Sequence, residues 1–255
     1  MIKAIILASG RGERMMPLTK NTPKPLLKIN GKPMIECAID LLASYGVKNI
    51  GINLFYLGDQ IKKYLGDGKK LNVNIAYVEE KFLTGTAGGV KNVARTLNVT
   101  EPFFAISSDI LMNFPLDQVY KFHLKHGGIA TLCCYWRPKE AVYKSGVILF
   151  DKKTNNIQKF LERPRTEEEI ISQWVNSSVY VFSPKILDYI PDEVDNSPVV
   201  DLAKHVFPVL LKKEKMYAFP IDGEKYYQLG MDTPDRLPRA ENDIKSGKFK
   251  PLTTS

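Results

Sequence analysis

The chain has 255 residues, of which 44% are hydrophobic and 25% charged, and this composition suits one large globular domain. No apolar run approaches the roughly 18 residues of a membrane helix, no signal sequence is evident, and the three cysteines lack disulfide or metal spacing. We therefore expect a cytoplasmic protein that does not contact membranes. The net charge of +8 would suit nucleic acid, but the lysines are dispersed and do not alternate with aromatic residues. Small anionic substrates, or a merely solvated lysine-rich surface, are simpler accounts, and no nucleic-acid partner is expected.

The first 130 residues alternate between strand-like and helix-like patterns. This alternation predicts a parallel sheet with helices on both faces. The predicted strands cover residues 2–7, 48–53, 73–78 and 103–107, and the predicted helices cover 33–45, 57–65, 85–97 and 116–125.

The second half is richer in strands. Strands are predicted at 130–136, 146–150, 157–162, 175–182 and 216–220, and helices at 184–189, 199–212 and 234–246. No linker or repeat divides the chain, so we predict one α/β domain over residues 1–247, with parts at 1–130 and 131–247. The polar tail at 248–255 is expected to fray.

The first predicted strand runs into a glycine-rich loop that carries basic residues. Ser9, Gly10, Arg11 and Gly12 form the loop, and Arg14 follows it. Glycines let the backbone approach a ligand, and backbone N–H groups and fixed cations offset negative charge, so the loop predicts a polyphosphate site. Neither the Walker A spacing nor the third glycine of the dinucleotide fingerprint is present.

Two later strand ends carry further candidate residues, because open parallel sheets bind ligands beyond the carboxyl ends of their strands. After the third strand, residues 83–89 are small and open a helix, so that a flat base could lie on the backbone there. Glu80 precedes this turn, and its carboxylate could accept hydrogen bonds from guanine. The fourth strand ends near Asp109, which is well placed to hold Mg²⁺ over phosphates.

The sequence LASGRGERMMPLT at residues 7–19, followed by a Pro-Lys-Pro around Lys24, resembles the opening signature of the nucleoside-diphosphate-sugar pyrophosphorylases. These enzymes are also called sugar-1-phosphate nucleotidyltransferases, and the resemblance covers about residues 1–245. It implies a Rossmann-like, mostly parallel sheet flanked by helices with an inserted sugar-binding β-region, which is the nucleotide-diphospho-sugar transferase fold. Residues 1–130 would be its nucleotide-binding part, and residues 131–247 its sugar-binding part.

The resemblance implies a Mg²⁺-assisted in-line displacement in which an NTP and a sugar 1-phosphate give an NDP-sugar and pyrophosphate. It leaves a homo-oligomer open. Arg14 would hold the β- and γ-phosphates, Lys24 the sugar phosphate and the α-phosphate, and Asp109 the metal. The predicted nucleotide-binding residues are Leu7, Ala8, Ser9, Gly10, Arg11, Gly12, Glu80, Gly85 and Thr86.

The second metal ligand has two candidate positions. The family's late W-x-D-I-G-T-P element resembles residues 227–234, in which the usual Asp falls on Gln228. A Met-Asp-Thr version of this element resembles the cytidylyltransferase branch that makes CDP-glucose, where the Asp binds metal. We therefore predict Asp232 as the second ligand beside Asp109; the alternative is that Asp232 only caps the last helix.

Three elements resemble the sugar side of the family's site. Residues 160–164 resemble F-x-E-K-P, so Glu162 would hold sugar hydroxyls and Arg163, which replaces the Lys, would meet the sugar phosphate. Asn176 takes the place of the Asn that points at the sugar in I-N-A-G-I-Y-V-F. Gly146 lies in a Y-G-V-like turn at 143–147, whose backbone touches a sugar hydroxyl.

The base and the sugar stay open at this stage. Glu80 favours GTP with mannose or heptose 1-phosphate, and the Met-Asp-Thr element favours CTP with glucose 1-phosphate. UTP or dTTP with glucose 1-phosphate is the commonest activity of the family. The opening motif and residues 56–61 also resemble the uridylyltransferases that act on N-acetylmuramate 1-phosphate. A non-catalytic regulatory relative that binds a nucleotide sugar is a further alternative.

Overall fold

The computed structural model describes residues 1–143 and 145–250. Lys144, in the predicted 143–147 turn, and residues 251–255 of the predicted tail lie outside the described residues. Over the described ranges, no helix is long and apolar enough to cross a membrane.

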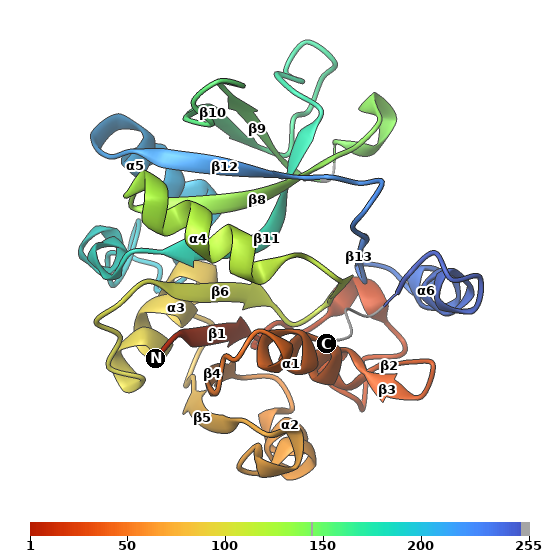
Figure 1. Ribbon diagram of the computed structural model, residues 1–255. Coiled ribbons are helices and arrows are strands. Elements are labelled where there is room, and N and C mark those ends of the chain that lie inside the picture. The colour runs from red at the N-terminus through yellow and green to blue at the C-terminus, as the bar shows by residue number, and fades with distance from the viewer. Residues whose placement is uncertain (144, 251–255) are drawn as a thin grey trace.

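A nine-stranded sheet runs through the centre of the molecule (Figure 1). The strand order is β10-β9-β11-β6-β1-β4-β5, while β8 pairs with β11 and β12 pairs with β8. The four strands from β6 to β5 are parallel, and β11 is antiparallel to β6. The strands are β1 (Lys3–Leu7), β4 (Asn49–Leu54), β5 (Asn74–Glu79), β6 (Phe103–Ser107), β8 (Ala130–Trp136), β9 (Gly146–Phe150), β10 (Ile157–Glu162), β11 (Trp174–Phe182) and β12 (Met216–Ile221).

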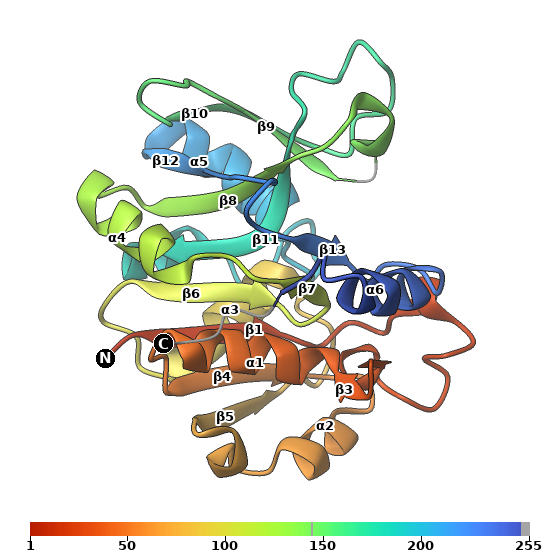
Figure 2. The ribbon, with the colours of Figure 1, turned by 45° about the vertical axis from the view of Figure 1, so that its right-hand side comes forward.

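Helices cover both faces of this sheet. Figures 1 and 2 show α1 and α4 on one face and α3 and α5 on the other. The predicted α/β class, with a mixed, mostly parallel sheet flanked by helices, is confirmed. The helices are α1 (Met34–Ser44), α2 (Gly58–Leu65), α3 (Gly85–Thr96), α4 (Leu116–His126), α5 (Phe207–Lys213) and α6 (Arg236–Lys245).

The second half departs from the predicted helices in three places. Residues 184–189 form the 3₁₀ helix η5 (Pro184–Tyr189), and the helix predicted at 199–212 divides into the π-helix η6 (Leu202–Val206) and α5. Pro208, in the first turn of α5, has no N–H to donate back to the preceding turn, which therefore takes a wider form. The last helix begins at Arg236 with Asp235 as its N-cap, so the cap alternative for Asp232 is wrong.

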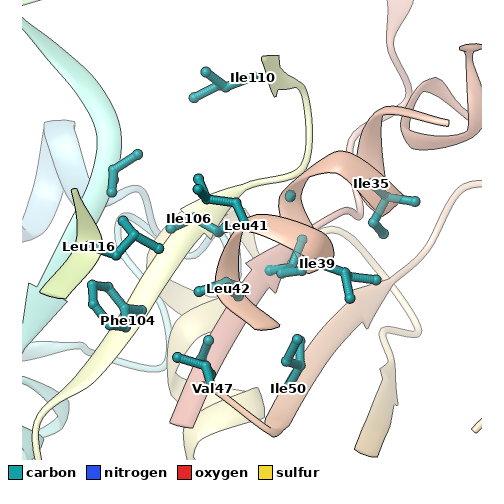
Figure 3. Packing of buried hydrophobic residues seen from close by; sticks show 14 of the residues in the cluster. Ile35, Ile39, Leu41, Leu42, Val47, Ile50, Phe104, Ile106, Ile110 and Leu116 are labelled. Atoms are coloured by element: carbon teal, nitrogen blue, oxygen red, sulfur yellow. The ribbon is translucent and has the colours of Figure 1, made fainter. Parts of the chain in front are cut away.

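The sheet buries side chains on both of its faces. Along β1, Ala4 and Ile6 pack in the cluster that contains the buried residues of α1, α2 and α4, while Ile5 packs in the cluster of α3 and α5. Figure 3 shows the first cluster, with Leu42 of α1 on the side of the helix toward Phe104 of β6. Because each large apolar side chain buried here contributes roughly 1.5–3 kcal/mol, the position of β1 is strongly determined.

A third cluster of buried residues joins the two ends of the chain. It brings together the 3₁₀ helix η1 (Glu13–Met15), the hairpin of β2 (Lys28–Ile29) and β3 (Lys32–Pro33), the pair of β7 (Ile110–Met112) and β13 (Gln228–Gly230), and α6. Met15 and Met231 are both fully buried in this cluster. The residues next to them in sequence, Arg14 and Asp232, are therefore held close together in space.

The ring of His123 is buried in the core. His123 of α4 is only 2% exposed, and its Nδ1 lies 3.0 Å from the Thr131 hydroxyl. Burial lowers the pKa of His123 to about 4 from an ordinary value of 6.5. As the pH falls below 6.5, His123 becomes protonated in the unfolded chain but stays neutral in the folded chain. The free energy of unfolding therefore decreases until the pH reaches about 4, where the folded chain also binds the proton.

We predict that the free energy of unfolding decreases by about 2 kcal/mol, through His123 alone, when the pH is lowered from about 7.5 to about 5. Urea denaturation at intermediate pH values measures the effect. His123→Gln, which keeps a hydrogen-bonding side chain but cannot take up the proton, should remove that part of the pH dependence. An identical pH dependence for the variant and the parent would contradict the assignment.

Candidate active site

The glycine-rich loop after β1 has a backbone that only glycine adopts easily. Gly12 has φ +67°, and a Cβ at this position would lie 3.0 Å from both Lys24 Cβ and Thr19 Cγ2. The Thr19 hydroxyl donates to the Gly12 carbonyl at 2.9 Å, which fixes the turn. Lys24 therefore packs directly against the loop that the sequence predicts as the phosphate site.

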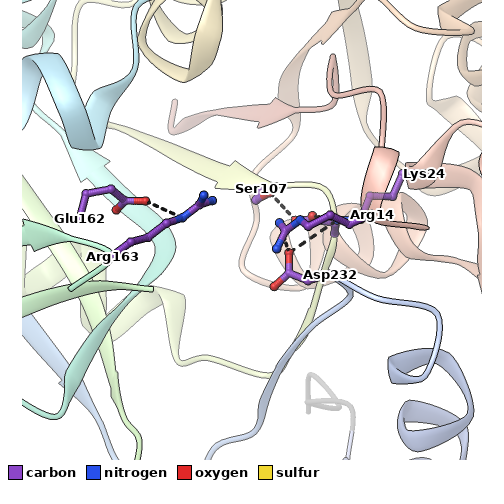
Figure 4. A network of polar contacts seen from close by, with 7 residues as sticks. Arg14, Lys24, Ser107, Glu162, Arg163 and Asp232 are labelled. Carbon is purple, nitrogen blue, oxygen red and sulfur yellow. Dashed lines mark hydrogen bonds and ion pairs between the residues drawn. The ribbon is translucent and has the colours of Figure 1, made fainter. Parts of the chain in front are cut away.

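Two cations and two carboxylates meet beside this loop (Figure 4). The Lys24 ammonium is ion-paired with Asp109 and lies 3.9 Å from Asp232 Oδ1. Arg14 Nη2 lies 2.8 Å from the same Asp232 oxygen. The Ser107 hydroxyl donates to the second oxygen of Asp109. One ammonium thus lies between two carboxylates that are far apart in sequence.

Backbone hydrogen bonds hold the segments of Asp109 and Asp232 next to each other. The Met231 N–H donates to the Asp109 carbonyl at 2.9 Å, which ties the segment after β13 to the end of β6. The Ser108 N–H donates to the Leu7 carbonyl at 3.1 Å, which ties the end of β6 to the end of β1. The site therefore depends on the sheet and on the third core cluster together.

Asp109 is held in its charged form. Burial by itself would raise its pKa, but the Lys24 charge and the hydrogen bonds from Lys24 and Ser107 outweigh it and hold the pKa below its usual value. The side chains of Lys24 and Asp109 are 12% and 24% exposed, so this ion pair is only weakly screened by solvent.

The donor set at this point fits a hard divalent cation. Asp109 and Asp232 supply carboxylate oxygens, the ligands that Mg²⁺ prefers, and Mg²⁺ usually takes only one or two carboxylates from the protein. In the described part of the chain, no group of three or more His, Cys, Asp or Glu residues could hold a metal ion. A metal bound here would therefore complete its coordination with phosphate or water oxygens.

The opposite wall of the site is the N-terminus of α3. Gly85 has φ +75°, and a Cβ there would lie 2.5 Å from the Val200 carbonyl oxygen. That carbonyl accepts from Ala87 N at 2.8 Å, and Val200 N donates to the Thr84 carbonyl at 2.9 Å. The segment before η6 is thus docked onto the first turn of α3.

Asn53, which the sequence analysis did not single out, connects the two walls. It is 1% exposed, and its Oδ1 accepts from Ala8 N at 2.8 Å. Its Nδ2 donates to Ser9 Oγ at 3.0 Å and to Glu80 Oε1 at 2.7 Å. A buried amide at the end of the strand predicted at 48–53 was the available signal, because buried polar groups at strand ends require partners.

The structure places Glu80 behind the pocket and not at its surface. Glu80 is 9% exposed, its second oxygen accepts from Thr84 N at 3.2 Å, and it is not among the residues that line the cavity. Both of its oxygens are therefore engaged inside the protein, where they hold Asn53 and the turn before α3.

A cavity of about 570 Å³ lies between these walls. It is lined by most of the predicted phosphate, nucleotide and metal residues, namely Leu7, Ala8, Ser9, Gly10, Arg11, Gly12, Arg14, Lys24, Gly85, Thr86, Asp109 and Asp232. Asn53 and Asp201 also line it, although the sequence analysis named neither.

The predicted sugar-side residues form a separate group, and Figure 4 shows Glu162 and Arg163 apart from the Lys24 cluster. Arg163 Nε lies 3.4 Å from Glu162 Oε1, and Gly146 pairs with Glu162 across β9 and β10. The Asn176 amide donates to the Tyr180 hydroxyl at 2.8 Å and accepts from Ser178 N at 3.2 Å.

Gln228 lies away from Lys24. Its Oε1 accepts from the Ser177 hydroxyl at 2.9 Å, and it is not among the residues that line the cavity.

A glycine-rich loop with paired cations and carboxylates lies at the carboxyl edge of the parallel strands, which is where open α/β sheets bind their ligands. Residues 3–245 match the family described as nucleotidyl transferase, and the chain belongs to this family.

Among curated proteins, the chain is 31% identical to mannose-1-phosphate guanyltransferase beta-B of Xenopus laevis over 224 residues. It is 34% identical to the Drosophila melanogaster mannose-1-phosphate guanylyltransferase catalytic subunit beta, and 32% identical to the UTP–glucose-1-phosphate uridylyltransferase of a Synechocystis strain. These alignments cover 87%, 87% and 91% of this chain, but the chain spans only 58–59% of the length of these relatives.

Solved structures share the fold. A Bacillus anthracis protein assigned as a glucose-1-phosphate thymidylyltransferase, in complex with a sucrose, has a TM-score of 0.83 at 19% identity over 100% of this chain and 98% of that one. HddC from Yersinia pseudotuberculosis, in complex with GMP-PN, has a TM-score of 0.77 at 21% identity over 96% of this chain and 100% of that one.

The internal bonds of Glu80 lead to a prediction about base choice. Glu80→Gln keeps one oxygen that can accept from Asn53 and loses the acceptor for Thr84 N. Because both contacts lie behind the cavity, this loss should affect all nucleotides alike, so the relative affinities for five NTPs, measured by calorimetry, should stay within about twofold of the parent. The adjacent, exposed Glu79→Gln serves as a matched control. A loss of GTP affinity alone, by tenfold or more, would show that Glu80 reads the base.

Proposed function

We propose that this protein is a cytoplasmic sugar-1-phosphate nucleotidyltransferase, which converts an NTP and a sugar 1-phosphate to an NDP-sugar and pyrophosphate. One observation carries the proposal: the Lys24 ammonium lies between Asp109 and Asp232 at the edge of the glycine-rich loop. This arrangement supplies both signs of charge at the point where a nucleoside triphosphate must meet a second phosphate.

The chemistry requires no covalent intermediate with the protein. A phosphate oxygen of the sugar 1-phosphate attacks the α-phosphorus of the NTP, and the bond from that phosphorus to the bridging oxygen breaks as pyrophosphate departs. The residues of the site orient the two phosphates in line and offset the charge that accumulates between them. Arg14 holds the departing β- and γ-phosphates, and Lys24 contacts both the α-phosphate and the sugar phosphate.

Asp109 and Asp232 would together hold Mg²⁺. When bound, the ion neutralises charge on the reacting phosphates. Each of these carboxylates pairs with a cation in the protein alone, Asp109 with Lys24 and Asp232 with Arg14. Binding of the metal with the NTP would free both cations to contact phosphate oxygens.

GTP with mannose 1-phosphate is the first substrate pair that we propose, because relatives at 31% and 34% identity are named as mannose-1-phosphate guanylyltransferases. UTP with glucose 1-phosphate is the second candidate, because a relative at 32% identity over 245 residues is named for that reaction. Since Glu80 is bonded internally, we expect backbone groups around residues 83–85 to contact the base.

A pyrophosphate-release screen that crosses five NTPs with a panel of sugar 1-phosphates tests the proposal. We expect Mg²⁺-dependent release with at least one pair, and equal release of the matching NDP-sugar. Folded protein that released no pyrophosphate with any pair, but bound nucleic acid in a salt-dependent manner, would contradict it.

Lys24→Ala should lower turnover by roughly 100-fold or more, because it removes a charged contact to the reacting phosphates. Steady-state kinetics with the best substrate pair measures the loss. Lys20→Ala removes a lysine from the same segment, outside the residues that line the cavity, and should be nearly silent. Near-parental turnover of Lys24→Ala would refute the role of this lysine.

Asp232→Asn should raise the Mg²⁺ concentration needed for half-maximal turnover by about tenfold or more, because a neutral amide binds a hard cation weakly. Gln228→Ala, at the other candidate position, should leave the Mg²⁺ titration unchanged. Superimposable titrations of Asp232→Asn and the parent would remove Asp232 from the metal site.

A further inference from the structure

Asp201 is a carboxylate in the cavity that the proposed reaction leaves without a role. It lines the cavity with Asp109 and Thr86, and its side chain is 29% exposed. The Thr86 hydroxyl donates to Asp201 Oδ1 at 3.2 Å and accepts from Leu202 N at 2.9 Å. Thr86, which the sequence predicts as a nucleotide contact, thus also fixes the position of Asp201.

A second carboxylate, Glu162, lies on the same side of the sheet. Phe160 and Glu162 lie two residues apart on β10 and therefore point to the same face of the sheet. The ring centroid of Phe160 lies 5.3 Å from that of Phe207, the residue that directly follows η6. Asp201 immediately precedes η6, so Glu162 and Asp201 approach from two packed elements. Burial raises the pKa of Glu162; the charges of Arg163 and Lys204 act against this, and the charge of Asp201 adds to it.

The cations near these carboxylates lie at the periphery. Arg163 Nε is 3.4 Å from Glu162, Lys204 Nζ is 4.0 Å from Asp201 Oδ2, and both basic side chains are 61% exposed. Among the hydrogen bonds of the described residues, none reaches Asp201 Oδ2. If Arg163 contacts the sugar phosphate, as the family resemblance implies, this end of the site is left with two carboxylates and one solvated lysine.

We propose that Asp201 determines sugar specificity: with Glu162 it accepts hydrogen bonds from sugar hydroxyls and repels any sugar that carries a carboxylate. The inference rests on the proposed function and narrows its substrate class to neutral sugar 1-phosphates. Like charges placed together disfavour the wrong partner strongly. Uronic acid 1-phosphates and N-acetylmuramate 1-phosphate, which carries a lactyl carboxylate, are therefore excluded.

The test compares kcat/KM for an accepted neutral hexose 1-phosphate with two acidic analogues, the matching uronic acid 1-phosphate and N-acetylmuramate 1-phosphate. The parent should prefer the neutral sugar by about 100-fold, and Asp201→Asn should reduce that preference about tenfold. Asn keeps an oxygen that can accept from Thr86, and the ratio of two substrates on one preparation does not depend on the folded fraction. Asp59→Asn, which removes an exposed charge from α2, is the control and should leave the ratio unchanged.

Equal use of neutral and acidic sugars by the parent would overturn this inference while leaving the proposed function intact. So would an unchanged preference in Asp201→Asn. Absence of turnover with every sugar 1-phosphate and every NTP would overturn the proposed function, and the inference with it.

Discussion

The site depends on an ammonium held between two carboxylates, Asp109 and Asp232, that lie far apart in the sequence. Lys24 pairs with Asp109 and approaches Asp232, and Arg14 pairs with Asp232 from the other side. Such a cluster forms only if its four segments are fixed independently of the charges, because partly exposed ion pairs contribute little to stability. The burial of Met15, Leu27, Leu111 and Met231 in one apolar cluster fixes the segments that carry Arg14, Lys24, Asp109 and Asp232.

The side of the cavity formed by the N-terminus of α3 is likewise held in place by buried groups. Asn53 and Glu80 are buried polar groups whose hydrogen bonds join the ends of β1, β4 and β5 to the turn before α3. A buried amide or carboxylate that lost its partner would cost about 1–3 kcal/mol, so these bonds hold the loops of the site in one arrangement. Gly89 is part of this arrangement, since a Cβ there would lie 2.5 Å from Asn53 Nδ2.

Local patterns in the sequence were sufficient for much of the fold. The strands and helices of the first half follow from alternation and periodicity, and the rule that ligands bind at the carboxyl ends of strands led from β1 to the glycine-rich loop and from β6 to Asp109. The β7–β13 pair could not be predicted, because its strands are three residues long and join residues more than 100 positions apart. The same long-range pairing brings Asp232 to Asp109. Glu80 and Asp201 show a second limit of prediction from sequence. Only the packed structure shows that Asp201 lines the cavity and that Glu80 is buried behind the residues that line it.

The most direct measurement of the central claim is a crystal structure of the protein with Mn²⁺ and a non-hydrolysable NTP analogue, in which anomalous scattering locates the metal. We expect one Mn²⁺ bound by both Asp109 and Asp232, with phosphate oxygens completing its coordination and with Lys24 and Arg14 moved from the carboxylates to the phosphates. A metal bound to only one of these carboxylates, or beside Gln228, with Lys24 still paired to Asp109, would contradict the account.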